Sequence, residues 1–166
     1  MVVLVPWFIV MTAMTTADTG VPDFSGRWVL EPGQESVADV ARAMSITQAL
    51  VPGEPVSSPI RQVTVVRDCS TSSQTETYRI GASSITVPGW WLGEPKGPKT
   101  RQRVAWQDTT LVIDRGSYTG PAPEAGQWTE RRETWSLDPA GRLRLTIITR
   151  GSDRPVTTDV QLYRRE

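Results

Sequence analysis

The sequence predicts an all-β protein: an antiparallel up-and-down β-barrel of about eight to nine strands, with one helix between the first and second strands. Short runs rich in Val, Ile, Thr, Tyr and Trp recur over most of the 166-residue chain. Turn sequences such as Asp138-Pro139-Ala140-Gly141 separate them. Because consecutive runs are closely spaced, a meander is the economical topology, and closing it into a barrel hides its edge strands.

The first 17 residues are expected to be a signal peptide rather than part of the fold. Val2 to Ala13 is apolar and has about the length of a signal-peptide core, and Met14 to Ala17 ends in small residues suited to cleavage. The run is too short to span a bilayer. No Lys or Arg precedes Arg27, which leaves open an atypical signal or a different start. We expect one mature domain over residues 18–166 that is periplasmic or secreted, without a stable membrane span.

The first element of that domain is a strand, and the second is the only helical pattern in the chain. From Asp23 to Leu30, alternate residues share a face, with Trp28 on the same side as Leu30. Ser36 is a suitable helix cap with Asp39 three residues later. The residues Val37, Val40, Ala41 and Met44 recur at helical spacing, and the pattern ends before Pro52.

Everything after the helix reads as strands. Together with the first strand, these runs give nine candidate strands, separated by turn sequences such as Gln107-Asp108 and Gly151-Ser152-Asp153. The eight later runs are Arg61 to Arg67, Ser70 to Ile80, Ser83 to Val87, Lys99 to Trp106, Thr110 to Arg115, Gln127 to Leu137, Leu143 to Arg150 and Val156 to Arg165.

Composition excludes several classes of function. Eighteen basic residues balance eighteen acidic ones, which is not the excess of a nucleic-acid-binding protein. The chain has no histidine, so it lacks the commonest metal ligand and the usual general base. With Cys69 as the one cysteine, thiolate zinc sites and intrachain disulfides are excluded too. We expect no metal, no cofactor and no nucleic-acid partner.

One segment of the first strand resembles a known family. Asp23-Phe24-Ser25-Gly26-Arg27-Trp28 carries the Gly-x-Trp signature of the first strand of lipocalins and the wider calycin group. The later Glu133-Thr134-Trp135-Ser136-Leu137, followed by Gly141-Arg142-Leu143, is similar to the pattern of exported bacterial lipocalin-like proteins of unknown function. In calycins an arginine of the last strand packs across the tryptophan. The resemblance therefore implies that Arg164 or Arg165 covers Trp28.

The same motif has a physical explanation. A barrel closes where its first strand bends inward, and Gly26 would allow a close approach of the backbone while the Trp28 indole fills the floor. We interpret both residues as structural. The chain also departs from the family: it ends in its last strand, whereas lipocalins usually continue into a helix. Its order Tyr163-Arg164-Arg165 does not match the Arg-x-Tyr pair with which fatty-acid-binding proteins hold a carboxylate.

Strand alternation predicts a partly polar lumen. Along a barrel strand every second residue faces inward, so a confident core residue assigns the others. Such a lumen is costly unless its charged groups pair with one another, with water or with a ligand. With Trp135 and Leu137, Val104 and Trp106, and Tyr78 and Ile80 as anchors, the inward polar residues are Gln127, Thr129, Arg131, Glu133, Thr100, Gln102, Gln74 and Glu76.

A second group of candidates lies in loops. Trp90 and Trp91 are adjacent within the Gly- and Pro-rich segment from Val87 to Pro95, so in a regular strand one of the two indoles would be left at the barrel mouth. The alternative is a loop that buries both rings. Tyr118 and Trp128 flank another Pro-rich turn and would add aromatic surface.

The leading hypothesis is an exported barrel that binds a small hydrophobic or amphipathic, possibly anionic, molecule in its lumen. The ligand-binding candidates are Arg131, Glu133, Trp106, Gln102, Tyr78, Glu76, Trp90 and Trp91. A filled barrel that acts as an envelope interaction protein or inhibitor is the alternative. No catalytic constellation is present: Glu130 and Glu133 fall on opposite strand faces. An isomerase or cyclase that used one lumenal carboxylate is the third, less favoured alternative.

Overall fold

The computed structural model describes residues 21–34, 40–50, 62–70, 72–81, 83–86, 90–91, 94–95, 99–118 and 127–166. Side chains are described in all of these ranges except 83–86, 90–91 and 94–95. The expected signal peptide, residues 1–17, lies outside the described residues, as do residues 35–39 of the expected helix.

The described part of the chain is all-β. Each of the nine predicted strands is present, within a few residues of its predicted limits. The strands are β1 (Gly26–Leu30), β2 (Ala43–Ala49), β3 (Gln62–Asp68), β4 (Ser73–Arg79), β5 (Ser83–Thr86), β6 (Trp90–Trp91), β7 (Glu94–Pro95), β8 (Lys99–Gln107), β9 (Thr110–Tyr118), β10 (Trp128–Leu137), β11 (Leu143–Gly151) and β12 (Arg154–Arg165).

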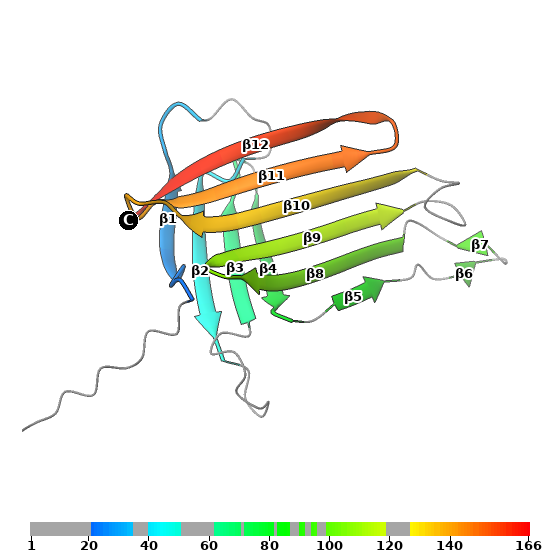
Figure 1. The fold of residues 1–166 in the computed structure, drawn as a ribbon, viewed down its shortest axis with the longest axis horizontal. Coiled ribbons are helices and arrows are strands. Elements are labelled where there is room, and N and C mark those ends of the chain that lie inside the picture. Colours follow the sequence, from blue (N-terminus) through cyan, green and yellow to red (C-terminus); the bar gives the residue numbers. More distant parts are fainter. Residues whose placement is uncertain are drawn as a thin grey trace, which may run out of the picture.

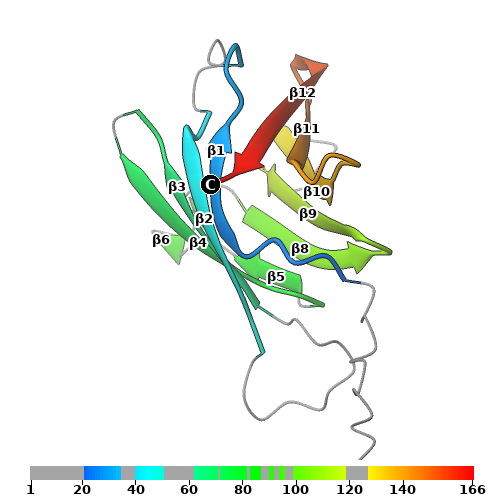
Figure 2. The same ribbon diagram turned by 90° about the vertical axis from the view of Figure 1, so that its left-hand side faces the viewer.

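Ten of these strands form one antiparallel sheet that curls into a nearly closed barrel. Their order is β4-β3-β2-β1-β12-β11-β10-β9-β8-β5, so that the first strand pairs with the last. In Figure 2, β1 to β4 lie on one side of the molecule and face β8 to β11 on the other. Strands β6 and β7 form a separate two-stranded sheet. The barrel is therefore a meander in which β12 returns to β1, as the short predicted connections favour.

The barrel is not fully closed between β4 and β8. No strand ladder joins these two strands among the described residues, and β5 pairs only with β8. One backbone hydrogen bond crosses the seam directly after β4, where Gly81 N donates to Val104 O at 2.8 Å. The seam is thus bridged next to the buried Val104.

The expected helix between the first two strands is not found in the described residues, and residues Ala43–Ala49, which include Met44 of the helical pattern, form β2 instead. Met44 and Ile46 are buried while Thr47 is exposed, which is the two-residue period of a strand. Val40 and Met44 also match a helical spacing, so the two patterns coincide at the start of the segment. Placement between β1 and β3, with ladders on both sides, favours the strand. No helix occurs in the described residues, and hence none that could cross a membrane.

A single hydrophobic core fills one end of the barrel. Alternate residues of the strands point into it, as in β11, where Leu143 and Leu145 are buried and Arg144 is exposed. The largest wholly buried side chains are those of Trp28, Trp135, Tyr78 and Tyr163. The core thus explains the aromatic residues that the strand alternation assigned inward.

The strands of the two sides differ in length. Strands β8 to β12 have nine to twelve residues, whereas β1 to β4 have five to seven. Figure 1 shows the long strands continuing past the short ones, away from the end where the chain terminates. Among the described strands, β1 to β4 therefore cover the inner face of the long strands near the core but not further along (Figure 1), and polar residues occupy the transition.

Candidate functional site

The first strand closes one end of the barrel. The Trp28 indole is fully buried, and its Nε1 donates a hydrogen bond to the carbonyl of Phe24 at 2.7 Å. The Arg165 guanidinium lies over the indole, 4.8 Å from the ring centroid, and is the last-strand arginine that the resemblance implied. Arg164, the other candidate, is exposed. This end is a packed floor, so a ligand site must lie elsewhere.

Gly26 has a different structural reason from the expected one. A Cβ atom there would lie 3.8 Å from Arg165 Nε, which is ordinary contact, so close backbone approach does not require glycine. Its φ of 127°, however, lies in a region that side chains disfavour. Glycine is needed for the bend at the start of β1 rather than for space.

Trp106 belongs to the same closed end. It is half-buried, and its ring lies 5.6 Å from that of Phe24. The indole Nε1 of Trp106 is buried and has no hydrogen-bond partner among the described residues. Trp106 faces the core as the strand alternation predicted, but it is not near the polar part of the lumen.

A cluster of five charged side chains and one tyrosine lies above the core, and we call it the lumenal charge cluster. Its members come from β3, β4, β9 and β10, and every one of them is on the inner face. The cluster consists of Arg67, Glu76, Tyr78, Arg115, Arg131 and Glu133.

Glu133 is the most deeply buried charged group of this cluster, with 1% of its surface exposed. Its carboxylate accepts hydrogen bonds from Arg131 Nε at 3.1 Å, from Arg67 Nη2 at 3.0 Å and from Trp135 Nε1 at 3.2 Å. The Arg67 guanidinium also lies 5.6 Å from the centroid of the Trp135 ring. Three donors offset the cost of burying this carboxylate, so it is a satisfied acceptor.

Glu76 is the second acceptor. It forms ion pairs with Arg67 and with Arg115, the latter at 2.9 Å, and accepts a hydrogen bond from the Tyr78 hydroxyl. Burial raises the pKa of the Glu76 carboxyl, but the hydrogen bonds from Arg115 and Tyr78 and the charges of both arginines outweigh burial and lower the pKa to about 2. Glu76 is therefore an anion throughout the physiological pH range.

The pKa values of Tyr78 and Arg67 are shifted as well. Burial, with the negative charge of Glu133 and the hydrogen bond to Glu76, raises the pKa of the Tyr78 hydroxyl, so it stays protonated. Burial alone would lower the pKa of Arg67, but the nearby carboxylates of Glu133 and Glu76 reverse this and raise it. The cluster is thus a fixed array of three cations and two anions with a net charge of +1.

The unused hydrogen-bonding capacity of the cluster is on the arginines. Both carboxylates are occupied, whereas Arg131 uses only its Nε and its side chain is 46% exposed. The Arg115 Nε is buried without a hydrogen-bond partner in the described part of the chain. The donors that an incoming group can reach are therefore those of the exposed Arg131, beside a net positive charge, and a carboxylate or another small anion matches both.

A pocket of about 380 Å³ opens at this cluster. Its apolar side includes Leu145, Ile147 and the ring of Tyr163, and its polar side includes the five charged members of the lumenal charge cluster together with Gln74 and Gln161. The Gln161 side chain is already engaged, since it accepts from the Tyr163 hydroxyl at 2.9 Å and donates to Asp159 at 2.6 Å. The volume lies in the range of small-molecule sites.

The structure brings together Arg131, Glu133, Tyr78 and Glu76 of the predicted ligand-binding residues. Gln102 lies beside Arg115 in the register of β8 and β9 but does not line this pocket. Trp90 and Trp91 form β6, but their side chains lie outside what the structure describes. Leu137, used as an inward anchor, is 36% exposed because it lies at the end of β10.

Two members of the cluster, Arg67 and Arg115, were missed. Both follow from the same alternation: Val63 and Val65 are buried on β3, and Leu111 and Ile113 are buried on β9, so the next residue in phase is the arginine. A strongly polar residue at the end of an apolar alternation is the signal that would have found them.

The described residues contain no group of three or more metal-ligating side chains. No protein-family model matches the chain, and the comparison with curated proteins finds no similar sequence. The structure therefore places the protein in the class of nearly closed antiparallel β-barrels. One end of the barrel is packed with side chains, and a charged pocket lies above this packed end.

Proposed function

We propose that this protein is an exported, lipocalin-like barrel that binds a small, partly apolar molecule carrying one acidic group. The acidic group contacts Arg131 and Arg115 in the pocket above the core, and the apolar part lies against Leu145, Ile147 and Tyr163. One observation carries the proposal: each carboxylate of the lumenal charge cluster already has three partners within the protein, while the cluster keeps a net charge of +1 and an exposed arginine, Arg131.

The alternatives have less support. A barrel acting only through its outer surface needs no polar pocket, and a pocket of about 380 Å³ is left above the core. An isomerase or cyclase would need a lumenal carboxyl with a raised pKa to act as a proton donor near neutral pH. Glu76 has a lowered pKa of about 2 instead. The arrangement therefore favours binding over proton transfer.

The test uses 8-anilinonaphthalene-1-sulfonate, a small aromatic anion whose fluorescence rises in an apolar pocket. Arg131→Met keeps most of the apolar stem and removes the charge, so the affinity for this probe should fall about 10- to 100-fold while the fold survives. Arg144→Met is the matched control, because Arg144 lies on the outer face of β11 and is exposed. The Arg144→Met variant should bind the probe with the affinity of the wild-type protein.

Equal affinities for the two variants would contradict the proposal. If Arg131→Met instead lowered the free energy of unfolding without changing probe affinity, the arginine would serve only the internal pair with Glu133.

A further inference from the structure

A second pocket lies outside the barrel, on the outer face of β8 to β11. It has a volume of about 450 Å³. We call it the outer arginine groove; its outward-facing residues are Arg101, Arg103, Asp114, Glu130, Arg132, Ile148 and Arg150. The remaining lining residues, Gln102, Arg115 and Arg131, are the intervening positions of the same strands.

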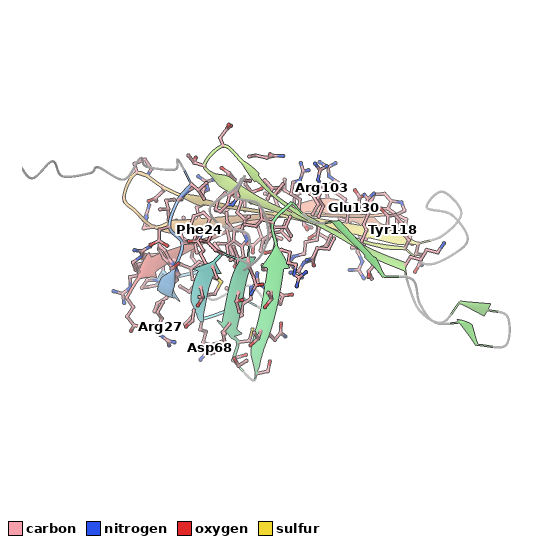
Figure 3. All side chains as sticks on the ribbon, turned by 90° about the horizontal axis from the view of Figure 1, so that it is seen from below. Phe24, Arg27, Asp68, Arg103, Tyr118 and Glu130 are labelled. Carbon is pink, nitrogen blue, oxygen red and sulfur yellow. The ribbon has the colours of Figure 1, made fainter. Side chains whose placement is uncertain are left out.

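The groove consists of two rows that cross the strands. In the first row the register places Arg103, Asp114 and Arg132 side by side, followed by Ile148. In the second row it places Arg101, Gly116, Glu130 and Arg150 side by side. Figure 3 shows Arg103 and Glu130 close together on this part of the sheet, far from Arg27 and Asp68 on the other side of the barrel.

Both carboxylates of the groove are already paired. Asp114 accepts from Arg132 Nε at 2.6 Å and from Arg132 Nη2 at 3.0 Å, which is a bidentate pair. Glu130 forms an ion pair with Arg101 and accepts a hydrogen bond from the Tyr118 hydroxyl at 3.2 Å. Two of the four arginines are thereby neutralised, and the groove keeps a net charge of +2.

Gly116 allows the Arg101 side chain to pack closely over the backbone of β9. The Arg101 guanidinium lies over the Tyr118 ring, 5.3 Å from its centroid. A Cβ atom at position 116 would lie 2.9 Å from Arg101 Nε and 3.1 Å from an edge atom of Tyr118. The glycine therefore makes room for this stacked pair beside the second row, on the side away from the first.

The two remaining arginines, Arg103 and Arg150, have no carboxylate within ion-pair distance among the residues that the structure describes. They stand at opposite edges of the groove, on β8 and β11, which are three strand spacings or about 14 Å apart. A single small anion cannot contact both arginines unless they move together. A molecule with an acidic group at each end can span the groove between them.

We propose that the outer arginine groove is a second ligand site, for a small elongated molecule with two terminal acidic groups held by Arg103 and Arg150. Each guanidinium binds one acidic group through charge-assisted hydrogen bonds, and the middle of the molecule crosses the outer face of β9 and β10, over Asp114, Gly116, Glu130 and Arg132. This site is distinct from the lumenal pocket, because Arg103 and Arg150 lie on the outer face of the sheet, whereas the arginines of the lumenal pocket lie on its inner face.

The experiment titrates the full chain with linear dicarboxylates from succinate to sebacate by isothermal titration calorimetry. Because the ligand must span two separated arginines, affinity should rise with chain length to a maximum, and the best diacid should bind about tenfold or more tightly than the monoacid of equal length. Arg103→Met and Arg150→Met should each reduce the diacid to the affinity of the monoacid. The double variant should bind the diacid more weakly still, since each single variant keeps one arginine that holds a carboxylate and the double variant keeps neither.

Two controls separate this site from the lumenal one. Arg144→Met should bind the diacid as the wild type does. Arg131→Met, which removes the proposed lumenal anchor, should keep the length optimum. An affinity independent of chain length, or Arg103→Met binding like Arg144→Met, would overturn the proposal. So would a diacid affinity that falls in Arg131→Met but not in Arg103→Met, which would assign the binding to the lumen.

Discussion

At the scale of single residues, the Trp28 side chain closes one end of the barrel, and its contribution to stability can be measured. Trp28 is fully buried, and its indole both stacks under the guanidinium and donates a hydrogen bond to Phe24. Trp28→Ala should lower the free energy of unfolding by about 3 to 5 kcal/mol, a large part of what a domain of this size possesses. Urea unfolding measures it. Trp128→Ala is the control, since Trp128 is only half-buried at the far end of β10, and equal losses in the two variants would contradict the role of Trp28 as the floor.

The lowered pKa of Glu76 predicts how the stability of the protein depends on pH. Its pKa falls from an ordinary value of 4.5 to about 2 in the folded protein. A carboxyl with a lowered folded pKa contributes stability above its unfolded pKa and loses it as the pH falls toward the folded one. We expect the free energy of unfolding to fall by about 2 kcal/mol between about pH 5 and pH 2 on account of this group.

Glu76→Gln should remove that part of the pH dependence, as measured by urea unfolding across this range. Glu166→Gln is the control, because Glu166 is 61% exposed and its ion pair with Arg27 at the surface is worth little. If the pH dependence of Glu76→Gln matched that of Glu166→Gln, the Glu76 ion pairs would not form in solution.

At the scale of elements, strands were predictable and the second element was not. Period-two alternation with Val, Ile, Thr, Tyr and Trp predicted nine of the strands of the structure, because most strands whose side chains are described have one more deeply buried face. The segment from Val37 to Met44 matched a helical spacing, but the chain continues as Ser45, Ile46 and Thr47, and β1 and β3 supply ladders on both sides of it. Tertiary pairing decided the outcome, and a local pattern does not contain it.

A pair of substitutions in β2 tests this element. Ile46 is 3% exposed and would lie off the apolar face of the expected helix, whereas Thr47 is exposed. Ile46→Ala should therefore cost about 2 to 5 kcal/mol in the free energy of unfolding, and Thr47→Ala should cost less than about 1 kcal/mol. Thermal or urea unfolding of both variants decides between the two structures. Comparable small losses would contradict the strand.

The candidate site could be predicted in part for the same reason. Arg131, Glu133 and Glu76 followed from alternation alone, since each lies in phase with a buried aromatic residue of its own strand. Sequence could not say that the three would meet with Arg67 and Arg115, because the cluster joins β3 and β4 to β9 and β10. The sequence also could not predict that the carboxylates of Glu76 and Glu133 would each have three partners, since this depends on distances between strands that are remote in sequence.

At the scale of the whole molecule, unequal strand length organises the charges. The core closes the end where β1 to β4 face β8 to β12, and the long strands extend the sheet beyond it (Figure 1). Arginines lie on both faces near this transition: Arg115 and Arg131 on the inner face, and Arg101, Arg103, Arg132 and Arg150 on the outer face. In each pocket the carboxylates are paired within the protein and the excess charge is positive. Both proposed anion sites follow from this arrangement of charges, although the formal net charge of the chain is zero.

The central claim is that the lumenal pocket selects a negative charge, and a pair of ligands of equal shape tests it most directly. Isothermal titration calorimetry of the full chain should compare hexanoate with hexanamide, which keeps the apolar tail and removes the charge. We expect hexanoate to bind about tenfold or more tightly, from a charge-assisted hydrogen bond of roughly 1.5 to 3 kcal/mol, and we expect this preference to vanish in Arg131→Met and to persist in Arg144→Met. Equal affinity of the wild-type protein for the acid and the amide would contradict the account.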